Sequence, residues 1–402
     1  MQSAQRDRTL LGVAGFLRAT ATSTAGITLG LHLGRLGLEP RTLGVVLSAG
    51  LSGAALAALL ATLFADRLGR RRFLLAVATL GALGTAIFAV SSEPLVLGVA
   101  AFAGMLNGMG RDRGAALILE TSMLPSTTDD RGRTRVIALY TMLQDLGHGL
   151  GAALVGASGF LAERHATAGP GHGYRALLLG CAALSAAGVL IYARLGAGLE
   201  VDETASRETL TPESRGILAR LSALFALDSL GGGFLTSALL SYFFFERFGA
   251  GPGAIGALFL GARLLNALSH LGAAWLAGRI GLVNTMVFTH IPSSVLLASV
   301  AFAPNFPIAA ALFLLREGLV EMDVPTRQSY VLAVVRPEER TFANGITNLV
   351  RLGSWAVAPS VAGLLMSAGS LHTPLVAGAG MKILYDLLLW RAFRKVKPPE
   401  ER

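Results

Sequence analysis

The sequence predicts an all-α integral membrane protein, with twelve transmembrane helices in two pseudo-symmetric six-helix bundles. Hydrophobic residues make up 53% of the 402 residues and charged residues only 15%, whereas a soluble domain carries about 25% charged residues. Apolar segments recur along the chain, and each is near the roughly 20 residues that cross a bilayer as a helix. Such segments must be helical, because lipid offers no water to satisfy their backbone N–H and C=O groups.

The apolar segments fall into two sets of six. The first six are Leu10–Leu33, Leu43–Ala65, Phe73–Val90, Leu95–Met123, Val136–Leu161 and Ala176–Ala193. The second six are Leu218–Phe245, Ala254–Ala277, Thr285–Ala303, Ile308–Val335, Phe342–Met366 and Pro374–Phe393. Between the sets, Glu200–Arg215 is polar and has no apolar face to bury. We therefore expect an N-terminal bundle over residues 1–195, a cytoplasmic linker over 196–216 and a C-terminal bundle over 217–402.

The basic residues indicate membrane orientation. A net charge of +9 would favour a nucleic-acid partner in a soluble protein, but here Lys and Arg gather in short loops on one side of the predicted membrane. Basic short loops mark the cytoplasmic side, so we expect no nucleic-acid partner and both termini in the cytoplasm. The richness in Arg, Ala and Gly favours a bacterial inner (cytoplasmic) membrane. The single cysteine, Cys181, excludes a disulfide within the chain and a cysteine metal cluster.

Two features suggest an internal duplication. The run Ala65–Arg72 closes the second segment with a tight basic turn, and Ala277–Gly281 closes the eighth in the same way. Asp129–Arg131 before the fifth segment likewise matches Glu338–Arg340 before the eleventh. Paired halves that move against each other around a central site provide alternating access. Within the first segment, Gly26, Gly30 and Gly34 are spaced four apart and predict close helix packing.

The helix count, the duplication, the linker and the loop motif together resemble the major facilitator superfamily (MFS). The family's cytoplasmic loop motif is Gly-x-x-x-Asp-Arg-x-Gly-Arg-Arg, and its first position is Thr62 here. The matching residues are Asp66, Arg67, Gly69, Arg70 and Arg71. The resemblance implies a gating role for this motif, with Asp66 contacting the start of the eleventh helix. The run Met322–Gln328 resembles little-characterised bacterial members, whereas the fifth-helix Gly-Pro pair of antiporters is missing from Gly147–Gly151, which leaves the direction of transport open.

Charged residues at membrane depth cost several kcal/mol each unless they are paired or hydrated, so they are the candidate substrate and proton-coupling residues. They are Arg18, Arg111, Asp112, Arg113, Asp145, Asp228, Arg263, Arg316, Glu317, Glu321, Asp323, Arg327 and Arg351. Asp228 stands alone among apolar residues and precedes three glycines. An ion-pair role for any of these residues is the structural alternative.

The tenth segment concentrates five of these carboxylates and arginines in a short stretch. Helical spacing predicts that Arg316, Asp323 and Arg327 share one face and neutralise one another. The same spacing places Glu317 and Glu321 together on another face, where two like charges favour protonation of one carboxyl. Pro325 interrupts this helix. The segment is equally compatible with a proton-coupling site and with a structural ion pair.

The remaining motifs limit the function. With Glu120 included, arginines and carboxylates at membrane depth balance at seven each, which gives no charge bias toward a substrate. The lone histidines His148 and His270 favour packing over metal binding, so we expect no metal and no cofactor. No enzyme nucleophile motif and no ATP-binding loop is present. We therefore predict a non-enzymatic, monomeric secondary transporter whose partners are a small-molecule substrate, protons and membrane lipid.

The family resemblance favours proton-coupled efflux of a small organic solute by alternating access. Three alternatives stay open: proton-coupled uptake, facilitated transport of an organic anion, and a lipid-moving or receptor-like membrane protein.

Overall fold

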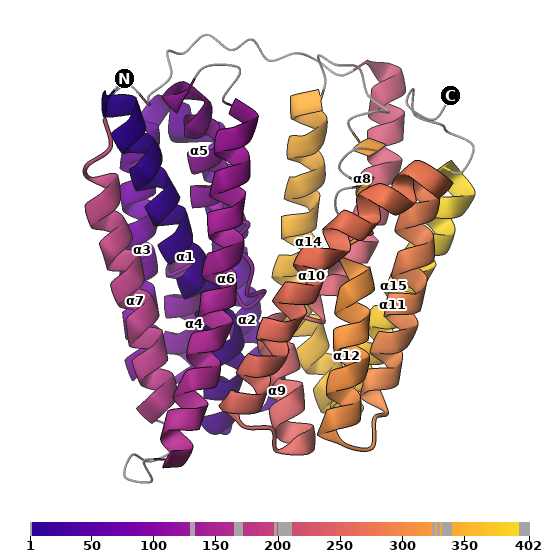
Figure 1. Ribbon diagram of the computed structural model, residues 1–402. Coiled ribbons are helices and arrows are strands. Elements are labelled where there is room, and N and C mark those ends of the chain that lie inside the picture. Colours follow the sequence, from indigo (N-terminus) through magenta and orange to yellow (C-terminus); the bar gives the residue numbers. More distant parts are fainter. Residues whose placement is uncertain are drawn as a thin grey trace. The chain divides into compact units, whose positions relative to one another are not determined.

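The chain, described as a computed structural model, is helical over its described residues and divides into two compact units (Figure 1). The described residues are 2–128, 133–164, 172–196, 199, 211–323, 326–327, 330–331 and 340–393. Unit 1 combines Met1–Thr204 with Thr236–Leu260, and unit 2 combines Ala205–Leu235 with Gly261–Arg402. The predicted linker lies largely outside the described residues, and the next helix already begins at Pro212. The boundary predicted at residue 217 remains a prediction.

Unit 1 contains the first six spans, followed by the end of the seventh span and the beginning of the eighth. Its elements are α1 (Gln2–Arg35), α2 (Pro40–Leu68), α3 (Arg70–Val90), α4 (Pro94–Ala103), α5 (Ala115–Met123), η1 (Leu124–Thr127), α6 (Arg133–Arg164), α7 (His172–Tyr192), α9 (Ser237–Phe248) and the first part of α10 (Pro252–Ile280). Helix α1 packs against α6, α7 and α9, and α3 packs against α7. Helix α1 is therefore central to this unit.

Unit 2 contains the rest of the second half. Its elements are α8 (Pro212–Gly233), the remainder of α10, α11 (Leu282–Ala301), α12 (Phe306–Val320), α14 (Arg340–Ala368) and α15 (Thr373–Phe393). Helix α8 packs against α14 and α15, and α11 packs against α12 and α15. Phe225, Tyr330 and Tyr385 are among the buried side chains of its apolar core.

The twelve predicted spans are present, but three of them are not the continuous helices that the apolar runs predicted. The fourth span breaks between α4 and α5, the seventh between α8 and α9, and the tenth at Glu321–Met322. Within the described ranges, seven helices are long and apolar enough to cross a membrane by length and composition. The apolar pattern does not reveal these breaks, because an irregular segment inside a protein can be as apolar as a helix. Discontinuous membrane helices recur at transporter binding sites.

The two loop motifs reverse the chain in the same way. Gly69 separates α2 from α3 with φ +93°, and Gly281 separates the corresponding helices of the second half with φ +85°. Positive φ is strained for residues that carry a Cβ atom, so glycine suits both positions. The tight turn predicted at Gly69 is confirmed, as is its counterpart.

The glycine stripe on α1 is a close packing surface. A Cβ atom at Gly30 would overlap the Ala238 carbonyl on α9, and one at Gly26 would overlap the backbone of Gly110. The close packing predicted for this stripe is confirmed. Gly110 lies in the break between α4 and α5, and Ala238 lies at the start of α9, just after the break in the seventh span. Both therefore pack against α1 close to a break in their own span.

Replacing Gly30 with alanine should destabilise unit 1 by about 1–3 kcal/mol, the usual cost of overpacking a tight contact. The new Cβ atom would push α1 away from α9, because its nearest neighbours are backbone atoms that cannot rotate aside. Denaturant unfolding of the purified protein in detergent measures the change. Gly180→Ala is the matched control, since nothing lies within 4 Å of that position. Equal stability of both variants would contradict the prediction.

Candidate functional site

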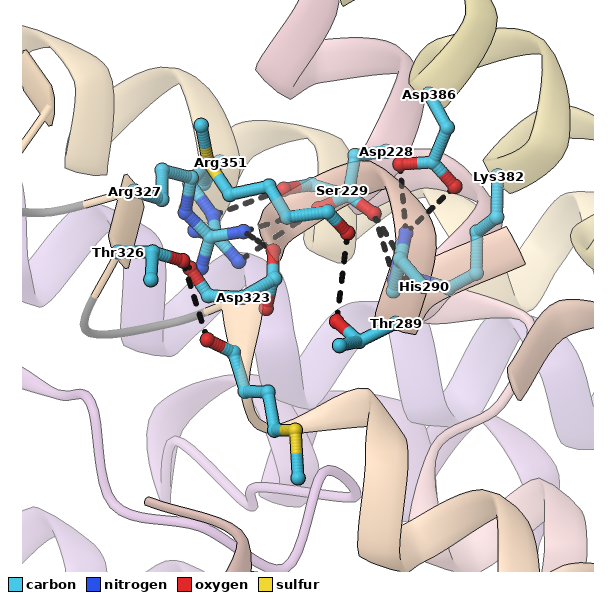
Figure 2. Close-up of polar contacts among 12 residues, drawn as sticks. Asp228, Ser229, Thr289, His290, Asp323, Thr326, Arg327, Arg351, Lys382 and Asp386 are labelled. Atoms are coloured by element: carbon cyan, nitrogen blue, oxygen red, sulfur yellow. Dashed lines mark hydrogen bonds and ion pairs between the residues drawn. The ribbon is translucent and has the colours of Figure 1, made fainter. Parts of the chain in front are cut away.

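Unit 2 holds a buried group of charged side chains, here called the unit 2 charge cluster (Figure 2). Its members come from five spans of the second half, and they meet at membrane depth. They are Asp228 on α8, His290 on α11, Asp323 and Arg327 beyond α12, Arg351 on α14, and Lys382 and Asp386 on α15. Each of these residues is no more than 9% exposed. Buried charges in lipid are stable only when paired, and the cluster supplies the partners.

Asp228 is the centre of the cluster. One carboxylate oxygen, Oδ1, accepts a hydrogen bond from Lys382 Nζ at 2.8 Å. The other, Oδ2, lies 3.6 Å from Arg327 Nη1 and 3.9 Å from Arg351 Nη2. Asp228 stands among apolar residues in the sequence, and the charges that neutralise it come from helices far away along the chain.

Both arginines that lie near Asp228 have a further partner. Arg327 also forms an ion pair with Asp323, one helical turn earlier. Arg351 donates from Nε to Ser229 Oγ at 3.1 Å. The aspartate and both arginines were sequence candidates, and the structure brings them together in one site.

His290 lies between two of the three carboxylates of the cluster, Asp386 and Asp228. Its Nδ1 atom lies 3.0 Å from both oxygens of Asp386, and its Nε2 atom lies 3.3 Å from Lys382 Nζ. A carboxylate only accepts hydrogen bonds, so Nδ1 carries the hydrogen and the lone pair on Nε2 faces the ammonium group. The Nε2 atom is also 3.9 Å from Asp228 Oδ1. Asp386, His290, Lys382 and Asp228 thus form a continuous polar chain.

Protonation of His290 would disturb the ion pairs of this polar chain of side chains. A proton added to His290 Nε2 would turn its lone pair into a donor, which repels the Lys382 ammonium and competes with it for Asp228. With His290 neutral, the three aspartates of the cluster balance Lys382 and the two arginines. One extra proton therefore leaves a net positive charge in a buried site, and a rearrangement or a second partner must compensate for it.

A second polar set in unit 2 lies between α10 and α12. Arg316 pairs with the neighbouring Glu317, and Asn266 Nδ2 donates to the other oxygen of the same carboxylate at 3.0 Å. Arg316 Nε and Asn266 Oδ1 are buried and have no hydrogen-bond partner among the described residues. One donor and one acceptor without a described partner thus lie beside a charge-balanced pair.

The helical-face prediction for the tenth span is confirmed for Asp323 and Arg327, which form an ion pair, but not for Arg316. Regular helix ends at Val320, and Glu321 and Met322 form a turn. Arg316 therefore pairs with Glu317 rather than with Asp323, and the predicted Glu317–Glu321 pair of like charges is replaced by this ion pair. Pro325 lies outside the described residues.

Unit 1 contains its own buried ion cluster around Arg18 on α1. The guanidinium donates through Nη1 and Nη2 to the two oxygens of Glu120, at 2.7 and 2.9 Å, and through Nε to Asp112 at 2.5 Å. The hydroxyls of Tyr140 and Tyr192 also donate to Glu120. The Glu120 side chain is completely buried. These contacts fix α1, α5, α6 and α7 to one another.

The loop motif makes contacts inside unit 1. Asp66 accepts from Arg70 Nε at 2.6 Å, and its side chain is 56% exposed. Arg70 also donates to the Ser122 carbonyl at 3.3 Å, and Arg71 donates to the Ala193 carbonyl. The arginines thus join the second and third spans to the fourth and sixth. The contact between Asp66 and the eleventh helix remains a prediction.

The other candidates are distributed over both units. Arg111 and Arg113 lie in the irregular segment beside Asp112, whose backbone N–H donates to His148 Nε2 at 3.2 Å. Asp145 is exposed on α6, and Arg263 lies on α10, one turn before Asn266. The side chain of His270 and the loop Asp129–Arg131 lie outside the part of the chain that is described.

Sequence reasoning missed several members of these sites. Lys382 and Asp386 are four residues apart inside the twelfth apolar segment, and the rule applied to the other spans would have found them. His290 and Asn266 carried no such signal, because lone polar residues in apolar runs are usually packing residues. Within the described ranges, no group of three His, Cys, Asp or Glu side chains could hold a metal ion.

Comparisons with known proteins agree with this architecture. The sequence profile of the Major Facilitator Superfamily matches residues 11–245 and 221–402. The uncharacterized membrane protein YJR124C of Saccharomyces cerevisiae is 26% identical over 419 residues, which cover 96% of this chain and 94% of the yeast protein.

Solved structures share the fold at low sequence identity. The nucleoside transporter NupG superposes with a TM-score of 0.75 at 18% identity, over 97% of this chain and 99% of NupG. A D-xylose-proton symporter superposes with a TM-score of 0.71 at 14% identity, over 98% of each chain. The human organic anion transporter MFSD10 gives a TM-score of 0.59 at 18% identity, over 96% of this chain and 99% of MFSD10. At these identities the likeness shows the fold alone.

Proposed function

Because this chain belongs to the Major Facilitator Superfamily, a family of membrane transporters, we propose that it is a proton-coupled carrier of a small organic solute. The observation that carries the proposal is the polar chain Asp386–His290–Lys382–Asp228 inside unit 2. A histidine ring has two nitrogen atoms, and its neutral form can bind one more proton. Here it lies between two carboxylates and an ammonium group, so its protonation changes the ion pairs that join α8, α11 and α15.

The coupling follows from the competition for Asp228. In the neutral cluster Lys382 holds α15 to α8 through this carboxylate. Protonated His290 favours a different pairing, in which Lys382 withdraws from the imidazole. Since helices α8, α11 and α15 carry the three groups, a proton and a change in helix packing become linked. Alternating access needs such a link between ion binding and the arrangement of the helices.

The solute that we propose is neutral and polar. Arg316 and Glu317 cancel each other's charge, and the free hydrogen-bonding atoms beside them are one donor and one acceptor. A hydroxyl group both donates and accepts, so it can satisfy both atoms at once. Among the structural neighbours, transporters for a nucleoside and for D-xylose carry hydroxylated solutes, which supports this choice. An organic anion is the alternative solute class.

Replacing Asn266 with alanine should weaken solute binding. We expect KM to rise about 2–10-fold, because a hydrogen bond contributes about 0.5–1.5 kcal/mol and each ~1.4 kcal/mol is a factor of ten. Uptake of labelled solute into proteoliposomes measures the change. Asn284→Ala is the matched control, since Asn284 is half-buried near the start of α11 and contacts Ile280 and Trp390. An unchanged KM in Asn266→Ala would remove Asn266 from the solute site.

We further propose export from the cell across a bacterial inner membrane, with both termini in the cytoplasm and the carrier acting as a monomer. The basic short loops support this orientation, and the direction rests on the family resemblance. Uptake, facilitated transport and a lipid-moving or receptor-like role are the alternatives. The proteoliposome assay described next tests the proposal against them.

Reconstituted proteoliposomes with an imposed pH gradient test the function. The panel contains uridine, D-xylose, benzoate and tetraphenylphosphonium, which represent two neutral hydroxylated solutes, an anion and a cation. We expect a neutral solute to be driven against its own gradient by the pH gradient. The sign of the driving gradient gives the direction, export or uptake. Movement of benzoate alone would favour the organic-anion alternative, and silence for every solute with no proton movement would contradict the carrier proposal.

A further inference from the structure

The break in the fourth span leaves irregular backbone at membrane depth. Residues 104–114 connect α4 to α5 without forming a helix, with Met105 at φ +51° and Gly110 at φ +68°. Irregular backbone is tolerated inside a membrane only where protein buries it or where it lines a water-filled cavity. The polar groups of this segment therefore need partners other than those of a helix.

Side chains provide only some of these partners. Asn107 accepts from the Met109 N–H at 2.9 Å and donates to the Arg111 carbonyl at 2.6 Å. Asp112 accepts from the Gly114 N–H at 3.2 Å. The segment thus folds around its own polar side chains, and the Asp112 carboxylate at its centre is the group that pairs with Arg18.

A cavity of about 130 Å³ lies against this segment, inside unit 1. Small residues of α1, α2, α3 and α7 form most of its wall, and their short side chains leave the volume between the helices unfilled. Its polar lining includes Arg18, Thr22, Asn107, Asp112 and Tyr192. Most of the cavity wall is apolar, and a purely apolar cavity of about 150 Å³ stays dry. The polar groups named above are what would provide hydrogen-bond partners for water in this one.

We propose that this cavity is a hydrated chamber that admits water and small neutral polar molecules to the Arg18–Asp112 ion pair. Three observations support it together: irregular backbone beside the cavity, an ion pair in its wall, and a volume sufficient for several waters. Water in the chamber screens the ion pair and lowers the cost of separating its charges. The irregular segment of the fourth span can then move without leaving bare charges in lipid. The proposal does not depend on the solute or on proton coupling.

The chain carries a built-in reporter for this chamber. Cys181 on α7 is the single cysteine of the sequence, it lines the cavity, and it is only 3% exposed. Iodoacetamide is a small, neutral and polar reagent. The Cys181 thiolate attacks its methylene carbon, forms an S–C bond and expels iodide, and the thiol proton passes to water. Alkylation at Cys181 therefore reports water and reagent inside the chamber.

The experiment follows alkylation of the folded, purified full chain by intact mass over time. We expect iodoacetamide to modify Cys181 at least 10-fold faster than it modifies the cysteine of the double variant Cys181→Ser/Ala152→Cys. Ala152 is completely buried in α6 and does not line the cavity. Equal slow rates at both positions would show a dry cavity and overturn the proposal.

A variant that fills the chamber provides the second test. A Cβ atom at Gly81 would meet its nearest neighbour at 3.9 Å, so Gly81→Leu can extend its side chain into the cavity. We expect it to slow alkylation of Cys181 at least 10-fold. Gly98→Leu on α4 is the matched control, since nothing lies within 4 Å of that position and it does not line the cavity. Size-exclusion profiles confirm that both variants fold, and unchanged labelling in Gly81→Leu would contradict a chamber at this site.

Discussion

Replacing Arg18 with methionine should destabilise the protein by about 3–5 kcal/mol, the cost of removing one partner of a buried ion pair. The guanidinium makes two hydrogen bonds to Glu120 and one to Asp112, and Glu120 is completely buried. Methionine fills a similar volume but leaves both carboxylates without a cation. Because Arg18 joins α1 to α5, α6 and α7 through these partners, the substitution should lower the free energy of unfolding of the whole of unit 1. Denaturant unfolding of the purified protein in detergent measures the loss.

A compensating substitution separates charge from packing. In the double variant Arg18→Met/Glu120→Gln, the completely buried one of the two carboxylates is replaced by a neutral amide. One tyrosine hydroxyl can still donate to the amide oxygen, and the other can accept from the amide NH2 group. We expect this variant to regain at least half of the lost stability. If Arg18→Met were as stable as the wild type, the Arg18 cluster would not be the main polar support of unit 1.

Replacing Lys382 with methionine should abolish proton-driven accumulation of the solute. The substitution removes the cation that shares Asp228 with His290, so protonation of His290 no longer displaces a competitor. We expect the accumulation rate to fall roughly 100-fold or more, which corresponds to about 3 kcal/mol of coupling free energy at ~1.4 kcal/mol for each factor of ten. Downhill movement of the solute should be affected less, because Arg316, Glu317 and Asn266 are unchanged. Parallel assays of accumulation and of downhill flux in proteoliposomes measure the difference.

The conservative variant Lys382→Arg is the matched control. It retains a cation near Asp228 and should keep more of the proton-driven accumulation than Lys382→Met. If Lys382→Met accumulated solute at the wild-type rate, competition for Asp228 could not be the coupling step.

The sequence predicted the features of the fold that depend on local patterns. Apolar runs indicated twelve spans, and the repeated basic turn indicated two related halves, which the matching conformations of Gly69 and Gly281 now support. The close packing of Gly30 could also be predicted, because four-residue glycine spacing has a direct meaning on a helix. The breaks at residues 104–114 and 321–322 could not, since hydropathy is insensitive to backbone conformation.

The sequence predicted several residues of the candidate site but not which of them form ion pairs with one another. Asp228, Arg327 and Arg351 were chosen because charges at membrane depth are costly, and the same cost explains why they meet. Which cation pairs with which carboxylate depends on tertiary packing, so Lys382 became visible as the partner of Asp228 only in the folded chain. His290 gains its significance entirely from its two neighbours, Asp386 and Lys382.

The most direct test of the coupling mechanism is proton movement driven by a solute gradient alone, recorded with a pH-sensitive dye inside proteoliposomes. With the neutral solute identified in the transport panel, wild-type protein should move protons in a fixed ratio to solute. His290→Gln, which retains a side chain able to hydrogen-bond but cannot take up a proton, should move solute without protons. Solute movement without any proton movement in the wild type, or unchanged proton movement in His290→Gln, would contradict the mechanism.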